Sequence, residues 1–243
     1  MEFDVFFLIL LPIVAFLYAA VGHGGASGYL ALMALFSLPV EIMRPTALVL
    51  NIFVAGISFY HFWNQGYFRS KLFLVFAISS VPMAYLGGLL DVNVKVYKVT
   101  LGIILVFAII RMLGYAAKES AELKNIRWGE GIGVGAVIGF LSGLIGIGGG
   151  IILSPVILIF RWGSVKEAAA VSALFIWVNS AAGLIGQLNS GVQLVDEIWI
   201  YVALAAIGGY VGAYVGSKKV SNRSLRYLLA FVLVLAAVKL VFV

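Results

Sequence analysis

Cysteine is absent from the 243-residue sequence, and charged residues are scarce. The absence of cysteine excludes disulfide bonds, thiolate metal sites and cysteine nucleophiles. Asp, Glu, Lys and Arg together make up 11% of the chain, whereas soluble domains carry roughly a quarter. A nucleic-acid-binding module would need a basic face on a soluble domain, so nucleic acid is not an expected partner.

Hydrophobic residues are abundant instead, at 63% of the sequence, and the mean hydropathy is +1.13. A water-soluble core of this size cannot bury so much apolar surface, so the lipid bilayer must solvate most of it. The start of the chain, residues 1–4, is acidic and lacks the basic residues of a signal peptide. We therefore expect an all-α, polytopic protein of the cytoplasmic membrane whose first apolar segment belongs to the mature chain.

Apolar segments follow one another along the whole sequence, and two of them are about half the 20 or so residues that a membrane span takes. The short segments are 26–37 and 150–160. A polar stretch at 115–130 predicts a cytoplasmic linker between a first transmembrane repeat, 1–114, and a second, 131–243. The other expected segments are 3–21, 45–63, 70–90, 94–114, 131–146, 167–187, 195–217 and 223–243.

The two halves resemble each other at five points in the same order, with an offset that drifts only from 124 to 129. Such self-similarity indicates an internal repeat. The matches are Gly22-His23-Gly24-Gly25 with Gly146-Ile147-Gly148-Gly149, Thr46-Ala47-Leu48 with Ser172-Ala173-Leu174, Asn51 with Asn179, Asn64-Gln65-Gly66 with Asn189-Ser190-Gly191, and Ala84-Tyr85-Leu86-Gly87 with Ala213-Tyr214-Val215-Gly216.

The distribution of basic residues predicts how the repeats are oriented. If each glycine-broken pair of segments forms a hairpin that enters and leaves on one side, each half has three further spanning helices and the two repeats have inverted topology. Twelve of the sixteen Lys and Arg residues then lie on one side, which the positive-inside rule makes cytoplasmic. Both termini fall on the non-cytoplasmic side. Parallel repeats would divide the basic residues almost evenly, so we reject that arrangement.

Three successive glycines, residues 148–150, indicate a break in a helix, because glycine carries a high entropy cost there. Backbone groups freed at bilayer depth must line a cavity. Each break precedes a half-helix, whose N-terminus offers free N–H groups and about half a positive charge to an anion. Inverted repeats bring two such ends together near the midplane. The alternative is that the glycines only allow helices to pack closely.

No carboxylate falls in the middle of a segment, which argues against a carboxylate proton relay and a divalent-metal carrier. We expect no metal and no cofactor, and a ligand bound by backbone N–H groups and neutral side chains. For the polar candidates, a hydrogen bond between helices is an equal alternative, and His23 can donate to the anion, titrate, or be structural. The candidates are Gly24, Gly25, Ser27, His23, Thr46, Asn51, Gly148, Gly149, Gly150, Ser154, Ser172 and Asn179.

The chain resembles the TauE/SafE family, the sulfite exporter or toluene-sulfonate permease group. The resemblance rests on the two G-x-G-G elements at 22–25 and 146–149, on Pro155, and on the stretches 46–51 and 172–179. It implies a secondary transporter of a small sulfur-containing anion, such as sulfite, sulfoacetate or another organosulfonate. We expect alternating access in which the two halves rock around the midplane site. A membrane potential of about 100 mV, negative inside, favours anion exit by about 2.3 kcal/mol per charge, which favours export.

Two other functions compete with a carrier. The same neutral site can line an anion channel. Residues 25–28 match the G-x-S-G pattern of intramembrane serine hydrolases, which would make Ser27 a nucleophile with a histidine partner. A duplicated break has no evident use in a hydrolase, so we expect no enzyme. The oligomeric state does not follow from the sequence.

Overall fold

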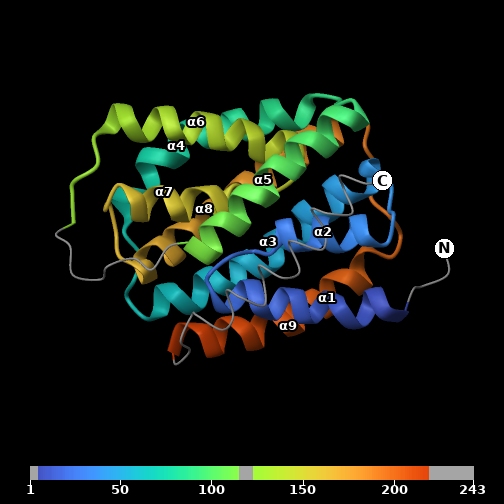
Figure 1. Ribbon diagram of the computed structural model, residues 1–243, viewed down its shortest axis with the longest axis horizontal. Coiled ribbons are helices and arrows are strands. Elements are labelled where there is room, and N and C mark those ends of the chain that lie inside the picture. Colours follow the sequence, from blue (N-terminus) through green and yellow to red (C-terminus); the bar gives the residue numbers. More distant parts are fainter. Residues whose placement is uncertain (1–4, 115–122, 219–243) are drawn as a thin grey trace.

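The computed structural model describes residues 5–114 and 123–218, and every regular element within them is a helix (Figure 1). The predicted segment 223–243, both termini and part of the linker lie outside the described residues, and with them the predicted orientation of the termini. The helices are α1 (Val5–Ala20), α2 (Ala26–Leu35), α3 (Val40–Asn64), α4 (Ser70–Leu89), α5 (Val94–Gly114), α6 (Trp128–Ile145), α7 (Gly150–Ile159), α8 (Val165–Asn189) and α9 (Ile198–Lys218).

Five of these helices, α3, α4, α6, α8 and α9, are long and apolar enough to cross a membrane. Helices α2 and α7 have ten residues each and begin directly after the glycine breaks. The all-α polytopic class is therefore confirmed, and the two half-length helices lie where the sequence predicts them.

Three helices begin earlier than their hydropathy indicates, because their first turns contain charged residues, and one of them is α6, which starts at Trp128 rather than at 131 and takes up the end of the predicted linker. Helix α8 starts at Val165 rather than at 167 and is closed by a capping box. The Ser164 hydroxyl accepts from the Glu167 N–H at 3.3 Å, and the Glu167 carboxylate accepts from the Ser164 N–H at 2.7 Å. Helix α3 starts at Val40 rather than at 45, with Pro39 at its N-cap and the acidic Glu41 in its first turn.

Two seams of glycine join helices that are far apart in the sequence. Within each seam the glycines are four residues apart, so they share one helix face and let two backbones touch. A Cβ at any of them would collide with a carbonyl oxygen of the facing helix. Gly208, Gly212 and Gly216 of α9 face the carbonyls of Pro12, Phe16 and Ala20 in α1, and Gly135, Gly139 and Gly143 of α6 face those of Phe76, Ser80 and Ala84 in α4.

The main helix pairs all join the first half of the chain to the second. Helix α1 packs on α9, α4 packs on both α6 and α8, and α3 packs on both α8 and α9. In Figure 1 the α4–α6 pair and the α1–α9 pair lie along opposite edges, with α3 and α8 between them. The helices thus form a first bundle of α1, α2, α3 and α9 and a second bundle of α4, α6, α7 and α8. Each bundle mixes both halves of the sequence.

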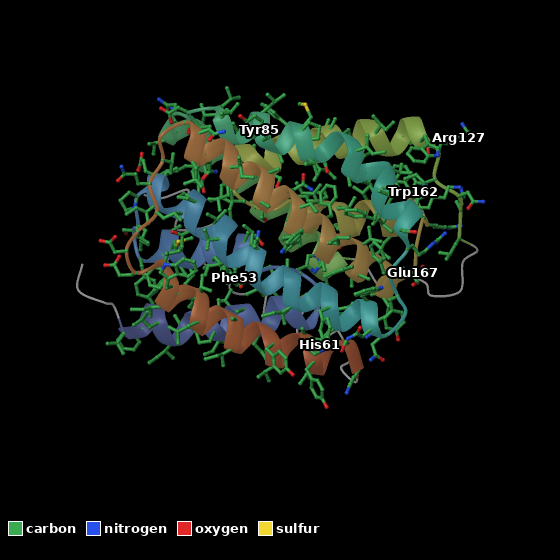
Figure 2. All side chains as sticks on the ribbon, turned by 180° about the vertical axis from the view of Figure 1, so that it is seen from behind. Phe53, His61, Tyr85, Arg127, Trp162 and Glu167 are labelled. Carbon is green, nitrogen blue, oxygen red and sulfur yellow. The ribbon has the colours of Figure 1, made fainter. Side chains whose placement is uncertain are left out.

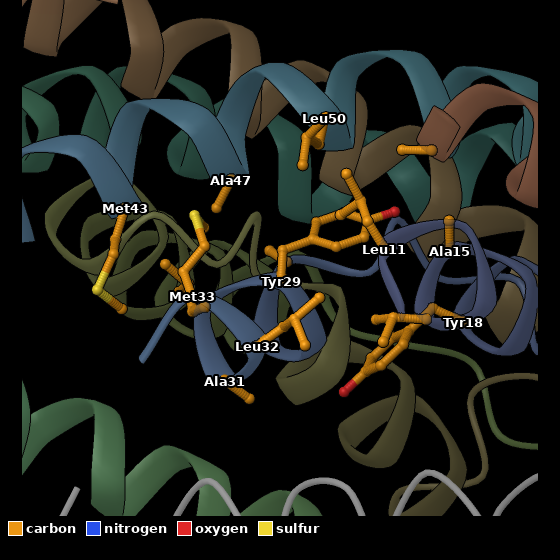
Figure 3. Close-up of a cluster of buried hydrophobic side chains, with 14 of the residues drawn as sticks. Leu11, Ala15, Tyr18, Tyr29, Ala31, Leu32, Met33, Met43, Ala47 and Leu50 are labelled. Atoms are coloured by element: carbon orange, nitrogen blue, oxygen red, sulfur yellow. The ribbon is translucent and has the colours of Figure 1, made fainter. Parts of the chain in front are cut away.

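The largest cluster of buried hydrophobic side chains lies where α1, α2 and α3 meet (Figure 3). Tyr29 and Leu32 of α2 pack there against Leu11 of α1 and Leu50 of α3. Other large apolar side chains point outward, including Ile207 at 64% and Trp199 at 66% exposure. Exposure of so many apolar side chains to water would be unfavourable, so these faces are the ones that lipid covers.

Candidate functional site

Each half-helix begins at a glycine in the left-handed region. Gly25 caps α2 with φ 105°, and Gly149 caps α7 with φ 80°. Side chains with a Cβ rarely adopt this conformation, which explains the glycine at both positions. Neither glycine has a side chain that can accept a hydrogen bond from the first N–H groups of its helix. The first N–H groups of both helices are therefore available to a ligand at the positive end of the helix dipole.

The breaks fold each pair of helices into a hairpin. Gly28 of α2 lies against Val14 and Tyr18 of α1, and the Ser27 hydroxyl donates to the Tyr18 hydroxyl at 2.9 Å. In the second hairpin Gly149 lies against Ile138 of α6, and the start of α6 and the end of α7 line one cavity. Both half-helices thus turn back from the interior of the protein, and their N-termini are buried.

The two breaks meet at Asn51 and Ile176. A Cβ on Gly24 would lie 2.6 Å from Asn51 Oδ1 and 2.9 Å from Ile176 Cγ2. A Cβ on Gly148 would lie 2.5 Å from Asn51 Nδ2 and 2.8 Å from Ile176 Cγ2. Asn51 is the twelfth of the 25 residues of α3, and Ile176 is the twelfth of the 25 residues of α8. The breaks therefore converge halfway along the two central helices.

Asn179 does not occupy the position in α8 that Asn51 occupies in α3. Helices α3 and α8 begin and end 125 residues apart (165 − 40 and 189 − 64), which pairs Asn51 with Ile176. The sequence alignment paired Asn51 with Asn179 by residue type, three positions further on. The Asn179 amide instead donates to the Phe175 carbonyl of its own helix at 2.8 Å. The interior position of the second half is thus apolar.

The Asn51 side chain links the two bundles. It is fully buried, and its Nδ2 donates to the Ser180 hydroxyl of α8 at 3.2 Å. Its Oδ1 is buried and has no hydrogen-bond partner among the described residues. Buried acceptors of this kind are uncommon and call for a reason. The space between Asn51 and the two breaks is narrower than a methyl group, so this conformation is closed around an unsatisfied polar atom.

His23 connects the first break to the second half-helix. Its Nδ1 lies 3.0 Å from the Val21 carbonyl oxygen and its Nε2 lies 3.2 Å from the Ser154 hydroxyl, which is 2.7 Å from the Ser172 hydroxyl. Because a carbonyl oxygen only accepts, Nδ1 carries a proton in the first contact. If Nε2 of the imidazolium donates to Ser154, the Ser154 hydroxyl donates to Ser172; if Ser154 donates to Nε2 of the neutral ring, Ser172 must donate to Ser154. Protonation of His23 would reverse the polarity of this chain.

The remaining candidates are Thr46, Ser27 and Gly150, and of these Gly150 contacts a residue at which the breaks meet. Thr46 is buried in α3, five residues before Asn51. The Ser27 hydroxyl donates to the Tyr18 hydroxyl, while the Nε2 of His23 faces Ser154. Gly150 is packed against Ile176. Among residues 5–114 and 123–218, no group of three or more His, Asp or Glu side chains is placed to hold a metal ion.

Sequence reasoning missed Ile176 and Ser180, which contact the breaks and Asn51. Ile176 carries no polar signal, and only its helical position reveals it. Ser180 directly follows Asn179 in the sequence, so its placement depends on the register of α8 against α3.

Comparison with known proteins gives one family. The model described as "Sulfite exporter TauE/SafE" matches residues 6–240. The chain is 40% identical to the probable membrane transporter protein y4hK of Sinorhizobium fredii, over 94% of each chain. It is 29% identical to a probable membrane transporter protein of Methanocaldococcus jannaschii, over 96% of this chain and 95% of the relative. No solved structure matches the chain.

Proposed function

The chain belongs to the sulfite exporter TauE/SafE family of membrane transporters, and we propose that it exports a small sulfur-containing oxyanion across the cytoplasmic membrane. Sulfite, sulfoacetate and other organosulfonates are the substrate class. The observation that carries this proposal is the convergence of two uncapped half-helix N-termini on Asn51.

The chemistry of this point favours an anion. Backbone N–H groups at two helix starts supply partial positive charge, and a buried site strengthens it because water does not screen it. The side chains that contact both breaks, Asn51 and Ile176, are neutral, and so is Ser180, which contacts Gly148. A cation would find no carboxylate among them, whereas the oxygens of a sulfonate can accept from several N–H groups at once.

Asn51 supplies a further donor when its amide turns. Its Oδ1 faces Gly24 and its Nδ2 faces Ser180. A half-turn of the amide exchanges the two atoms, and the Ser180 hydroxyl can donate to Oδ1 as readily as it accepts from Nδ2. After the turn Nδ2 points at the first break, beside the N–H groups of α2. In this orientation Nδ2 can donate to a bound oxyanion, and Oδ1 accepts from Ser180, so both polar atoms of the Asn51 amide have a partner.

Transport requires the two bundles to separate, because the space at Asn51 is narrower than a methyl group. The sequence predicted that the two halves of the chain rock. The glycine seams argue for a different division, since α1–α9 and α4–α6 each join the halves through direct backbone contact. We propose that the first bundle moves against the second, with α3 sliding on α8. The Asn51–Ser180 and His23–Ser154 contacts then break and re-form in each cycle.

The test is anion flux in proteoliposomes with sulfite, sulfate, sulfoacetate, an aryl sulfonate and chloride. Asn51→Asp keeps the shape of the side chain and places a negative charge between the two helix starts, so it should abolish flux. Asn64→Asp makes the same change at the exposed end of α3 and should keep it. Folded wild-type protein that transports none of the sulfur oxyanions would refute the substrate class. A requirement for an inward sodium or proton gradient would refute uncoupled export.

A further inference from the structure

A second polar site lies at the end of the molecule where α6 begins and α7 ends. It is a cavity of about 570 Å³. Figure 2 shows Arg127 and Trp162 at this end, away from Phe53 in the middle of the molecule. Three cations and one carboxylate line it, which leaves an excess of two positive charges (three minus one). The lining residues are Lys124, Asn125, Arg127, Glu130, Ile159, Phe160, Arg161 and Trp162.

Backbone hydrogen bonds hold the walls of this cavity in place. The Lys124 N–H donates to the Arg161 carbonyl at 2.8 Å, which ties the segment before α6 to the turn after α7. Arg69 Nη1 donates to the Trp162 carbonyl at 3.1 Å. The rings of Phe160 and Trp162 stack with centroids 4.8 Å apart. The cations are therefore carried by a fixed frame and not by a free loop.

The three cations have no ion-pair partner within the described part of the chain, where the ion pair is Arg69–Glu167 at 3.7 Å. Lys124, Arg127 and Arg161 are all exposed. Arg127 is also the N-cap of α6 and makes no side-chain cap. No carboxylate of the described residues therefore neutralises the guanidinium and ammonium groups around the cavity through an ion pair.

The first half of the chain provides an internal comparison for Arg161. Ser37 ends α2 with φ 58° as Arg161 ends α7 with φ 60°. The turns are alike, since Leu38 N donates to Met33 O at 3.0 Å and Trp162 N donates to Ile157 O at 2.9 Å. The same turn forms with serine in one half, so the fold does not require the guanidinium in the other. The guanidinium of Arg161 is therefore not needed to form the turn.

We propose that this cavity binds a phosphate group, presented by an anionic phospholipid. Guanidinium groups bind phosphate through paired hydrogen bonds, and basic clusters at the ends of membrane helices attract anionic headgroups. The apolar rim matches the rest of a lipid: Ile159 is 46% and Phe160 is 52% exposed beside the cations. Trp128, at the start of α6 and 48% exposed, is typical of the membrane interface. A free phosphate would satisfy the cations and leave this rim without a partner.

The test is lipid binding by purified full-length protein in a neutral detergent, read by native mass spectrometry and thermal shift. The probes are phosphatidylglycerol, phosphatidylcholine and inorganic phosphate. The triple variant Lys124→Gln, Arg127→Gln, Arg161→Gln should lose affinity for phosphatidylglycerol by about tenfold or more. The matched variant Lys71→Gln, Lys95→Gln, Lys98→Gln removes the same charge elsewhere and should bind like wild type.

Two outcomes would overturn the proposal. Undiminished phosphatidylglycerol binding by the folded triple variant would show that the cavity holds no headgroup. Stabilisation of wild type, but not of the triple variant, by inorganic phosphate as strongly as by phosphatidylglycerol would assign the cavity to a soluble phosphate. Arg161→Lys separates charge from geometry, because it keeps the charge and removes the paired hydrogen bond, so it should lose part of the affinity.

Discussion

Asn51 and Ser180 lie 129 residues apart in the chain and share a hydrogen bond of 3.2 Å in the buried centre of the protein. The bond joins α3 to α8, and therefore the first bundle to the second. It sits where both glycine breaks converge. The contact that closes the two bundles is thus also the one nearest to the proposed anion site, so ligand binding and bundle separation act on the same atoms.

We predict that Ser180→Ala destabilises the closed state by about 1 kcal/mol, because the Asn51 amide loses its partner while it stays buried. The measurement is the thermal unfolding midpoint by tryptophan fluorescence. Ser58→Ala is the control: the Ser58 hydroxyl, in α3, is also buried but has no hydrogen-bond partner within the described part of the chain, so its removal should cost little. Equal loss in both variants would mean that the Asn51–Ser180 bond contributes no stability.

We predict that Gly24→Ala severely impairs transport. The new methyl group would lie 2.6 Å from Asn51 Oδ1 and 2.9 Å from Ile176 Cγ2, and such overpacking costs about 1–3 kcal/mol. Flux in proteoliposomes is the measurement. Gly133→Ala in α6 meets nothing within 4 Å and should transport normally. Normal flux in Gly24→Ala would contradict a site between the breaks.

We predict that Gly139→Leu and Gly212→Leu each prevent folding, since each side chain would collide with a backbone carbonyl of the facing helix. One variant opens the α4–α6 seam and the other opens the α1–α9 seam. The yield of monodisperse protein in size-exclusion chromatography measures the effect. Gly133→Leu makes the same change on an open face of α6 and should leave the yield intact. Folded protein from either seam variant would show that the seam is dispensable.

We predict that His23 and Ser154 are energetically coupled, because Nε2 and the hydroxyl lie 3.2 Å apart across the two bundles. A double-mutant cycle with His23→Ala and Ser154→Ala should give a coupling energy of about 0.5–1.5 kcal/mol. The coupling energy is measured from thermal stability, once without sulfite and once with sulfite present. Strict additivity of the two substitutions would show that the contact between His23 and Ser154 contributes no coupling energy.

The candidate site shows how far residue types can be read without a fold. The sequence identified Asn51, His23, Ser154 and both breaks, and the structure places these residues together. It paired Asn51 with Asn179, whereas the register of α3 and α8 pairs it with Ile176. Aligning two halves of a repeat by residue type pairs identical residues even where the helices are offset. A shift of three residues nearly completes a helical turn, so Asn179 lies close to the same face of α8 as Ile176 but farther along the helix axis. The position along the helix therefore decides which of the two side chains reaches the breaks.

The sequence by itself determined the membrane class, the helices and the two breaks. Lipid offers no hydrogen bonds, so the long apolar stretches form helices, and the glycine-rich elements at 22–25 and 146–150 mark where a helix breaks. Only the tertiary structure decided which helices pair. Apolar faces are interchangeable in lipid and carry no partner information, so close backbone contact at the glycine seams selects α9 for α1 and α6 for α4. That selection mixes the two halves into two bundles and brings both breaks to Asn51.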